Sequence, residues 1–190
     1  MVKSKPSVGI VNIAGGNIRS LYAAIDKKKF TVADINDLDS RDEFDTIVFP
    51  GVGNIAKLSS LMSSAKDSIL ERHIRRNGNI VGICMGFQIL SEYSLETHQA
   101  TRALSLLDGH INRLQSLQCQ VGWNTVSFDS SSRFYQFDNC NFYFNHGYSL
   151  CGTDTDFVTG YTKVNKLETI PSVVEKGNIV GFQFHPEKSH

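Results

Sequence analysis

The chain lacks several features that would place it in a whole class of proteins. Its 190 residues carry 19 basic and 19 acidic side chains, so no charge excess draws it to nucleic acid or to a membrane surface. No apolar run approaches the length of a membrane span, and no hydrophobic signal core follows Met1–Pro6. We therefore expect a cytoplasmic protein whose partners are small molecules and other proteins, with no nucleic acid and no membrane.

Cysteine is scarce, and its spacing does not suit metal binding. The four cysteines, Cys84, Cys119, Cys140 and Cys151, include no C-x-x-C pair, so neither a zinc site nor a redox pair is indicated. In a reducing compartment they remain free thiols. Free thiols suit a catalytic cysteine, and we expect no metal.

Apolar runs that suit buried strands alternate with helical periodicity in the first half of the chain. The runs lie at 8–11, 46–49 and 80–83, and the helical stretches at 18–25, 55–62 and 85–92. From Gly109 onward, short alternating segments predict antiparallel strands at 125–128, 142–144 and 157–161. The sequence thus predicts an α/β fold with an open, mixed and mostly parallel sheet, flanking helices, and antiparallel strands added in the second half. A chain of this length buries one core, so a single domain over 1–190 is expected.

Cys84 lies where a strand is expected to turn into a helix. The segment Gly82-Ile83-Cys84-Met85-Gly86 follows an apolar run. Small residues two positions before and after a nucleophile permit the sharp turn of a nucleophile elbow. A helix N-terminus beside the sulfur is expected to favour thiolate over thiol, and the backbone N–H of Met85 is free to face an oxyanion. Taken alone, Cys84 also fits a buried structural cysteine.

A histidine and a carboxylate close the last apolar strand. His185 and Glu187 are separated by Pro186, so both side chains can point the same way and the carboxylate can orient the ring. The pair is far from Cys84 in sequence, as expected when a Cys-His-acid triad is assembled by the fold. We therefore predict Cys84, His185 and Glu187 as catalytic residues, although His-Pro-Glu by itself is a common surface turn.

A glycine-rich loop, Pro50-Gly51-Val52-Gly53-Asn54, follows the strand at 46–49. Its backbone N–H groups can approach a ligand closely and complete an oxyanion hole with Met85. The segment Gly51–Ala56 also fits G-x-G-x-x-A with Glu71 further on, a weak dinucleotide fingerprint. Glu71 falls in a stretch with helical character, 68–74, whereas the acid of that fingerprint ends a strand.

The one dense basic run, Arg72–Arg76, is predicted to be the solvated end of that helix, where cations are favoured by the helix dipole. His73, within this run, has no neighbouring pattern that suggests chemistry. We expect it at the surface.

Together these elements resemble the class I, or triad, glutamine amidotransferases, whose motifs are an oxyanion loop P-G-x-G, a nucleophile block G-x-C-x-G-x-Q and a terminal H-P-E. The resemblance extends over essentially the whole chain. Within that class, the chain is most similar to the family of glutaminase subunits of imidazole glycerol phosphate synthase. The segments that carry this similarity are Gly16–Ser20, Pro50–Gly53, Gly122–Asn124, Tyr143–Tyr148 and Gly181–Ser189.

The resemblance implies an enzyme that hydrolyses glutamine to glutamate and ammonia, without a cofactor. The ammonia would pass to a separate (β/α)8-barrel cyclase subunit, which makes imidazole glycerol phosphate and AICAR in histidine biosynthesis. The residues of the oxyanion site would be Gly51, Val52, Gly53 and Met85. Those that would contact glutamine are Gln88, Asn145, His146, Gly147 and Tyr148, with His146 expected to be structural. For the heterodimer interface we predict Trp123, Asn124 and Lys188, although a lone Trp fits core packing equally well.

The chain departs from this family on the substrate cleft and the expected partner face. Cys119 and Gln120 stand where the family usually has Pro-His, and Asn145 and Gly147 replace a Val and a Ser or Thr beside His146. These departures leave open a paralogous subunit that supplies ammonia to a barrel synthase for amidination of a bacterial surface sugar. A cysteine peptidase or γ-glutamyl hydrolase would keep the nucleophile and base but need no partner. A non-catalytic interaction subunit would be expected to have lost one of them.

Overall fold

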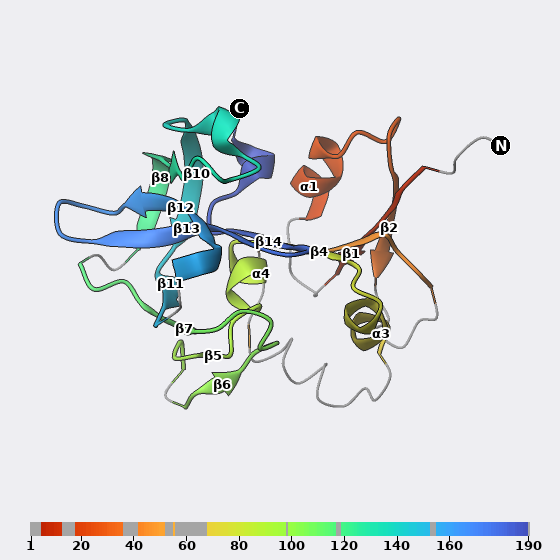
Figure 1. The fold of residues 1–190 in the computed structure, drawn as a ribbon, viewed down its shortest axis with the longest axis horizontal. Helices are drawn as coiled ribbons and strands as arrows, with labels where there is room; N and C mark the ends of the chain where they lie inside the picture. Colours follow the sequence, from red (N-terminus) through yellow and green to blue (C-terminus); the bar gives the residue numbers. More distant parts are fainter. Residues whose placement is uncertain are drawn as a thin grey trace.

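The computed structural model of the chain describes residues 5–12, 18–35, 42–51, 55, 68–97, 99–116, 119–152 and 155–189. Its main sheet contains the strands β1 (Ser7–Val11), β2 (Thr31–Ile35), β3 (Thr46–Phe49), β4 (Asn79–Ile83), β9 (Ser127–Phe128), β12 (Val158–Lys163), β13 (Thr169–Lys176) and β14 (Ile179–Phe182). The strand order is β2-β1-β3-β4-β14-β13-β12-β9 (Figure 1). The strands expected at 8–11, 46–49 and 80–83 are thus present as β1, β3 and β4. The helix expected at 55–62 lies, apart from Ile55, outside the described residues.

The first half of the sheet is parallel and is covered on both faces. Strands β2, β1, β3, β4 and β14 pair in parallel, with α1 (Ile18–Ala24) on one face and α3 (Ile69–Arg75) and α4 (Met85–Gln88) on the other (Figure 1). Leu21 of α1 packs with one set of strand side chains, and Leu70 of α3 with the opposite set. Burial on both faces explains why these strands read as continuous apolar runs. Glu71 lies within α3 and not at a strand end. Within the described ranges, no helix has the length and apolar character needed to cross a bilayer.

The second half of the chain adds antiparallel strands, as predicted. In the main sheet, β13 pairs antiparallel with β14 and β12, and β12 pairs antiparallel with β9. A separate ribbon pairs β8 (Gln120–Thr125) with β10 (Asn141–His146), and a third sheet contains β5 (Tyr93–Ser94), β6 (Thr101–Arg102), β7 (His110–Arg113) and β11 (Tyr148–Cys151). The 3-10 helices are η1 (Tyr135–Phe137), η2 (Thr155–Phe157) and η3 (Pro186–Lys188). The predicted α/β fold class is confirmed.

Helix α4 is shorter than the helix predicted at 85–92, because it ends at Gln88. Beyond it, the N–H of Leu90 bonds to the carbonyl of Phe87 and that of Ser91 to the carbonyl of Gln88, which tightens the chain into a turn. The Ser91 hydroxyl also donates to the Gln88 carbonyl at 2.8 Å. The chain then leaves the helix for β5.

The expectation that Arg72–Arg76 is a solvated run is wrong for His73, whereas Arg76 is exposed as expected. His73 is only 1% exposed, and its Nε2–H donates to the carbonyl of Asn79 at 2.8 Å. The guanidinium of Arg76 donates to the other ring nitrogen at 3.2 Å and pairs with Glu43 at 2.8 Å. Burial lowers the pKa of His73. His73 lies on the side of α3 that faces the starts of the strands, and it is therefore buried.

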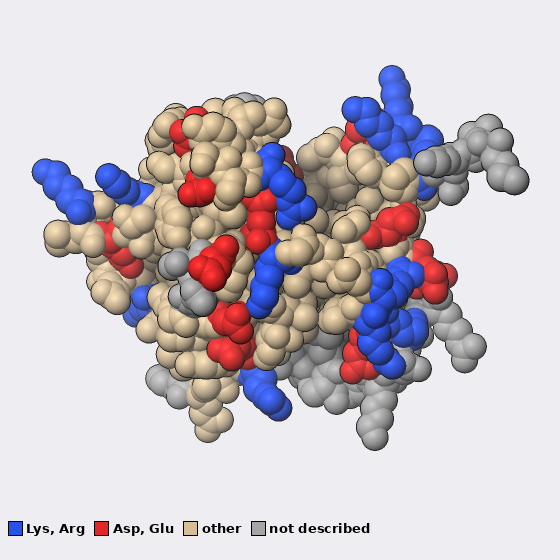
Figure 2. Space-filling model, in the orientation of Figure 1, with Lys and Arg blue, Asp and Glu red and all other residues tan. Residues whose placement is uncertain are grey.

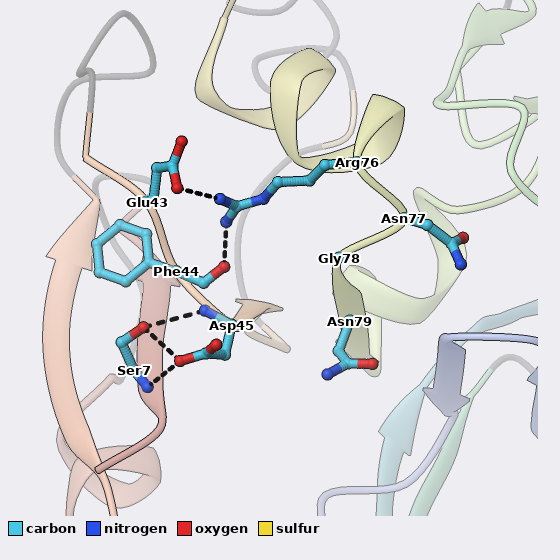
Figure 3. Close-up of a pocket in the computed structure, with 8 residues that line it drawn as sticks. All are labelled: Ser7, Glu43, Phe44, Asp45, Arg76, Asn77, Gly78 and Asn79. Atoms are coloured by element: carbon cyan, nitrogen blue, oxygen red, sulfur yellow. Dashed lines mark hydrogen bonds and ion pairs between the residues drawn. The ribbon is translucent and has the colours of Figure 1, made fainter. Parts of the chain in front are cut away.

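A hollow of about 470 Å³ lies at the amino ends of β1, β3 and β4 (Figure 3). Its charged groups have partners within the hollow: Arg76 pairs with Glu43 and donates to the carbonyl of Phe44, and Asp45 accepts from Ser7. The N–H and hydroxyl of Ser7 donate to Asp45 at 2.7 and 2.8 Å, and these bonds lower the pKa of that carboxyl. The hollow is therefore polar, and each of its charged side chains already has an ion-pair or hydrogen-bond partner.

Candidate active site

Three neighbouring parallel strands end beside one another and carry the three predicted elements. Strand β4 lies between β3 and β14. Its carboxyl end leads directly into Cys84, β3 leads into Pro50 and Gly51, and β14 leads through Gln183 and Phe184 into His185. In open α/β sheets, sites form outside the carboxyl ends of the strands. The sheet thus brings together a cysteine, a glycine-containing loop and a histidine that lie far apart in the sequence.

Cys84 occupies the sharp turn between β4 and α4. Its backbone has φ 50° and ψ −107°, a strained conformation for a residue other than glycine. An added Cβ would collide with backbone on either side: at Gly82 it would lie 2.5 Å from the Gly86 carbonyl oxygen, and at Gly86 it would lie 2.0 Å from that of Phe49. The predicted need for small residues two positions before and after Cys84 is confirmed.

His185 and Glu187 form a buried pair. The Nδ1–H of His185 donates to Glu187 Oε1 at 2.8 Å, and the two side chains are only 3% and 8% exposed. The His185 backbone N–H donates to the carbonyl of Tyr143 at 2.8 Å, and the Ser189 hydroxyl donates to the His185 carbonyl at 2.7 Å. The carboxylate fixes the tautomer with the proton on Nδ1, which leaves Nε2 as an acceptor that can take a proton.

Gly51 lies against both the thiol residue and the imidazole. A Cβ at Gly51 would be 2.6 Å from Cε1 of His185 and 3.0 Å from Cβ of Cys84. The space that Gly51 lines with Pro50, Ile83 and His185 measures only about 10 Å³, room for a single water. Of the predicted oxyanion residues, Val52 and Gly53 lie outside the described part of the chain. This small space lies beside the His185–Glu187 pair, and Cys84 is not among the residues that line it.

The expectation that a helix end makes Cys84 a thiolate is wrong. Burial raises the pKa of the thiol to about 12, and this outweighs the hydrogen bond from the Met85 backbone N–H, which lowers it. The nearby Glu187 charge raises the pKa further. Helix α4 is a single turn, too short to offset the desolvation. At neutral pH Cys84 carries its proton, and its Sγ–H donates weakly to the Asn145 carbonyl at 3.7 Å. The Met85 N–H faces the sulfur, and its predicted contact with an oxyanion stays a prediction.

Gln88 is buried and points at the segment predicted to contact glutamine. It is 6% exposed, and its Nε2 donates to the Tyr148 carbonyl at 2.8 Å and to Gln183 Oε1 at 3.2 Å. Gln183, which the sequence reasoning missed, is fully buried with its own Nε2 3.9 Å from Cys84 Sγ. The signal was present: Gln183 is the one polar residue between two phenylalanines in an apolar strand end.

His146 has no nitrogen free to act as a second base. Its Nδ1 lies 2.8 Å from the Tyr148 carbonyl oxygen, and its Nε2 lies 3.0 Å from the side-chain amide of Gln120. Burial lowers its pKa to about 4, so the ring is neutral near pH 7. Gly147 is similarly engaged, because its carbonyl accepts from the N–H of Leu114 at 3.0 Å. Both residues hold the segment in place.

The predicted interface residues divide between two sides of β8. Trp123 is 54% exposed, so it is not a core residue, and it contacts the Tyr143 ring edge-on at 6.2 Å. Lys188 Nζ lies 5.7 Å over the same ring, which is 6.3 Å from that of His185. Asn124 faces the other way, because neighbouring strand residues alternate, and it donates to the Lys163 carbonyl at 2.9 Å. On the face shown in Figure 2, basic and acidic side chains are intermixed.

Comparisons with known proteins show the family to which the chain belongs. The sequence model of the family described as "Glutamine amidotransferase class-I" matches residues 15–190. The imidazole glycerol phosphate synthase subunit HisH of Thermotoga maritima is 33% identical over 189 residues, which cover 96% of this chain and 90% of that protein. The subunit of the same name from Methanocaldococcus jannaschii is 30% identical over 186 residues, with 96% and 92% covered.

Solved structures are similar in fold. PurLQS from Thermotoga maritima matches with a TM-score of 0.70 at 21% identity, covering 97% of this chain and 89% of that one. A glutamine amidotransferase from the same organism matches with a TM-score of 0.67 at 15% identity, covering 97% and 77%. Identities this low speak for the fold alone, whereas the family match rests on sequence over nearly the whole chain. The chain therefore belongs to the glutamine amidotransferase class-I family of enzymes.

Proposed function

We propose that the chain is the glutaminase subunit of an imidazole glycerol phosphate synthase. It hydrolyses glutamine and delivers the ammonia to a (β/α)8-barrel cyclase subunit, which makes imidazole glycerol phosphate and AICAR in histidine biosynthesis. The observation that carries the proposal is a strained cysteine on an elbow beside a buried His185–Glu187 pair. It stands in a chain about a third identical to named subunits of that synthase.

In the first half of the reaction, Cys84 Sγ attacks the side-chain carbonyl carbon of glutamine. Nε2 of His185 takes the thiol proton and returns it to the departing ammonia, while Glu187 stabilises the imidazolium formed in between. Because the pKa of the buried thiol is about 12, the proton leaves as the S–C bond forms and not beforehand. The Met85 N–H and backbone N–H groups of the loop 51–53 would stabilise the oxyanion.

In the second half, water attacks the γ-glutamyl thioester. His185 Nε2 takes a proton from the water and passes it to the cysteine sulfur as the C–S bond breaks, which releases glutamate and restores the thiol. The same histidine thus serves both halves. No further acid or base is required.

We assign glutamine to the segment 145–148, whose backbone faces the thiol. The Tyr148 carbonyl already accepts from Gln88 and His146, which uses both of its lone pairs. Gln88 therefore acts by holding this segment. The Asn145 carbonyl lies 3.7 Å from the Cys84 sulfur, which would place this residue nearest the glutamine carbon that the thiol attacks. The substrate contacts come from backbone that buried side chains keep in place.

The burial of the reactive side chains points to activation by the partner. Cys84 is 5% exposed and His185 is 2% exposed, so both groups must become accessible before glutamine can react. Trp123 and Lys188, which adjoin the His185 ring through Tyr143, form the proposed cyclase-facing surface. We leave Asn124 out of this surface because its side chain bonds to Lys163 on the other side. A cyclase that docks there can bias the loop between its closed and open states.

The test is glutamate formation by the chain alone, with a histidine-pathway cyclase, and with that cyclase plus its nucleotide ligand. We expect slow turnover alone and the fastest turnover in the third mixture, with Cys84→Ser as the inactive control. Full activity of the chain alone would refute the gating. A cyclase that neither binds nor activates it would reassign the partner to a paralogous synthase, such as one for sugar amidination.

A further inference from the structure

We infer that Gln120 is a positioning residue for the substrate segment: through His146 it fixes the backbone of 145–148 in front of the Cys84 thiol and thereby sets the affinity for glutamine. The inference rests on the proposed glutaminase function. Its first link, the contact between Gln120 and His146, can be tested independently of that function.

The β8–β10 ribbon places the two residues opposite each other. Gln120 pairs with His146 in the antiparallel register, and each is only 7% exposed. The Gln120 amide lies 3.0 Å from His146 Nε2, and the Tyr148 carbonyl oxygen lies 2.8 Å from Nδ1. Since a carbonyl can only accept, Nδ1 carries the proton, and Nε2 of the neutral ring is an acceptor that requires a donor.

Only one orientation of the Gln120 amide supplies that donor. The two ends of a glutamine amide have nearly the same shape, and the hydrogen bonds decide which end lies where. With the oxygen toward His146, two acceptors would face each other, and the buried Nε2 of Gln120 has no partner among the described residues. With the NH2 group toward His146, the donor is satisfied and the ring nitrogen gains its bond. Gln120 therefore selects the Nδ1–H tautomer, which in turn holds the Tyr148 carbonyl.

From Tyr148 the contacts continue to the nucleophile. The same carbonyl accepts from Gln88 Nε2 at 2.8 Å, Gln88 donates to Gln183 at 3.2 Å, and the Gln183 amide lies 3.9 Å from Cys84 Sγ. Three buried glutamine side chains and one imidazole thus connect β8 to the thiol. The side chain of Gln120 bonds to His146, which itself belongs to the segment 145–148, so it acts on the placement of the substrate and not on the proton transfers.

The test compares Gln120→Glu with wild type in the complex with the cyclase. The carboxylate keeps the shape of the amide but can only accept, so His146 must become doubly protonated to pair with it. We expect the 15N spectrum of His146 near pH 7 to change from the neutral Nδ1–H form to imidazolium. The imidazolium keeps its Nδ1–H bond to the Tyr148 carbonyl, so the KM for glutamine should stay within about threefold of wild type in this variant. Gln120→Leu, which removes the donor to Nε2 and lets the proton move to that nitrogen, should raise the KM about tenfold and change kcat by less than about threefold, as the segment loses its hold.

Gln136→Glu, an exposed change of the same chemistry, is the matched control and should leave both readouts at wild-type values. If Gln120→Glu does not fold, the rise in KM of Gln120→Leu still tests the inference. An Nε2–H tautomer in wild type, an unchanged His146 spectrum in Gln120→Glu, or an unchanged KM in Gln120→Leu would overturn the inference. A wild-type complex without glutaminase activity would instead overturn the proposed function and with it the glutamine part of the inference, while the spectrum still decides the Gln120–His146 contact.

Discussion

The two ends of the parallel strands differ, because a hollow lies at one end and the reactive side chains lie at the other. A hollow of about 470 Å³ lies at the amino ends of β1, β3 and β4 (Figure 3), whereas the space of about 10 Å³ beside His185 at the carboxyl ends has room for a single water. The charged groups of the hollow already have ion-pair or hydrogen-bond partners. At the carboxyl ends lie a strained cysteine and a buried histidine whose Nε2 has no partner among the described residues. The arrangement of reactive side chains, and not the size of a hollow, marks the functional end.

Each end also contains a histidine packed against a glycine. A Cβ at Gly78 would lie 2.2 Å from the His73 ring, and one at Gly51 would lie 2.6 Å from the His185 ring. Both nitrogens of His73 are bonded, to Asn79 and Arg76, so it can only support the fold. His185 has a carboxylate on one nitrogen and, among the described residues, is free on the other. The same packing thus serves structure at one end and, in our proposal, catalysis at the other.

The largest effect expected at the carboxyl end is that of Cys84→Ser. The change removes the nucleophile with little change in volume, so glutamine hydrolysis by the cyclase complex should fall by at least about 10⁴-fold while the fold is kept. Glutamate release and thermal unfolding measure the two. A variant that keeps most of its turnover would remove Cys84 from the mechanism.

Glu187→Gln should come next. The amide keeps the shape but no longer stabilises imidazolium at His185, so kcat should fall about a hundred- to thousandfold, less than in Cys84→Ser. Steady-state kinetics on the complex measure this. Wild-type turnover in this variant would mean that another group orients His185.

Gly51→Ala and Gly78→Ala form a matched pair across the two ends. Both add a methyl group against a histidine ring. Gly51→Ala should displace His185 and Cys84 and reduce kcat about a hundredfold, since misplacement by an ångström has such effects. Gly78→Ala should lower the free energy of unfolding but leave turnover per folded molecule unchanged. Equal losses of turnover in the two variants would contradict the distinction between a catalytic end and a structural end.

The pH dependence of stability should reflect a buried histidine near each end. The pKa of His146 is lowered from 6.5 to about 4, and that of His73 is lowered too, both chiefly by burial. The unfolded chain therefore binds more protons below about pH 6.5, so stability is full above that pH and falls as the pH drops toward 4. His146 alone should lower the free energy of unfolding by about 2 kcal/mol between pH 7 and pH 5.

Urea unfolding at several pH values tests this, with His146→Gln as the comparison. The variant should show a flatter pH dependence, whatever its absolute stability. A slope equal to that of wild type would show that His146 does not titrate in this way.

The smallest effect is expected at the amino end. Glu43 is 79% exposed in its ion pair with Arg76, so Glu43→Gln should change the free energy of unfolding by less than about 1 kcal/mol and should not change turnover. Urea unfolding and glutamate release measure the two. A clear loss of glutaminase activity would mean that the hollow contributes to catalysis, contrary to our proposal.

Much of the fold could be predicted from the sequence because parallel strands buried on both faces leave apolar runs. The elbow could also be predicted, because backbone that lies close to Cys84 leaves no room for a side chain at Gly82 or Gly86. What failed depended on surroundings contributed by distant segments. Burial and the carboxylate of Glu187 raise the pKa of Cys84, and the strand starts bury His73. The roles of Gln120 and Gln183 arise from pairing between strands that sequence spacing does not specify.

The most direct test of the account is covalent labelling with a glutamine analogue that carries an electrophile at the γ-carbon. Mass spectrometry would follow the thiols of Cys84, Cys119, Cys140 and Cys151 in the chain alone and in the cyclase complex. We predict slow labelling of Cys84 alone in the free chain and rapid labelling of the same residue in the active complex, because docking opens the site. Equal labelling of the exposed Cys119 and Cys140, or none of Cys84 in the active complex, would contradict the account.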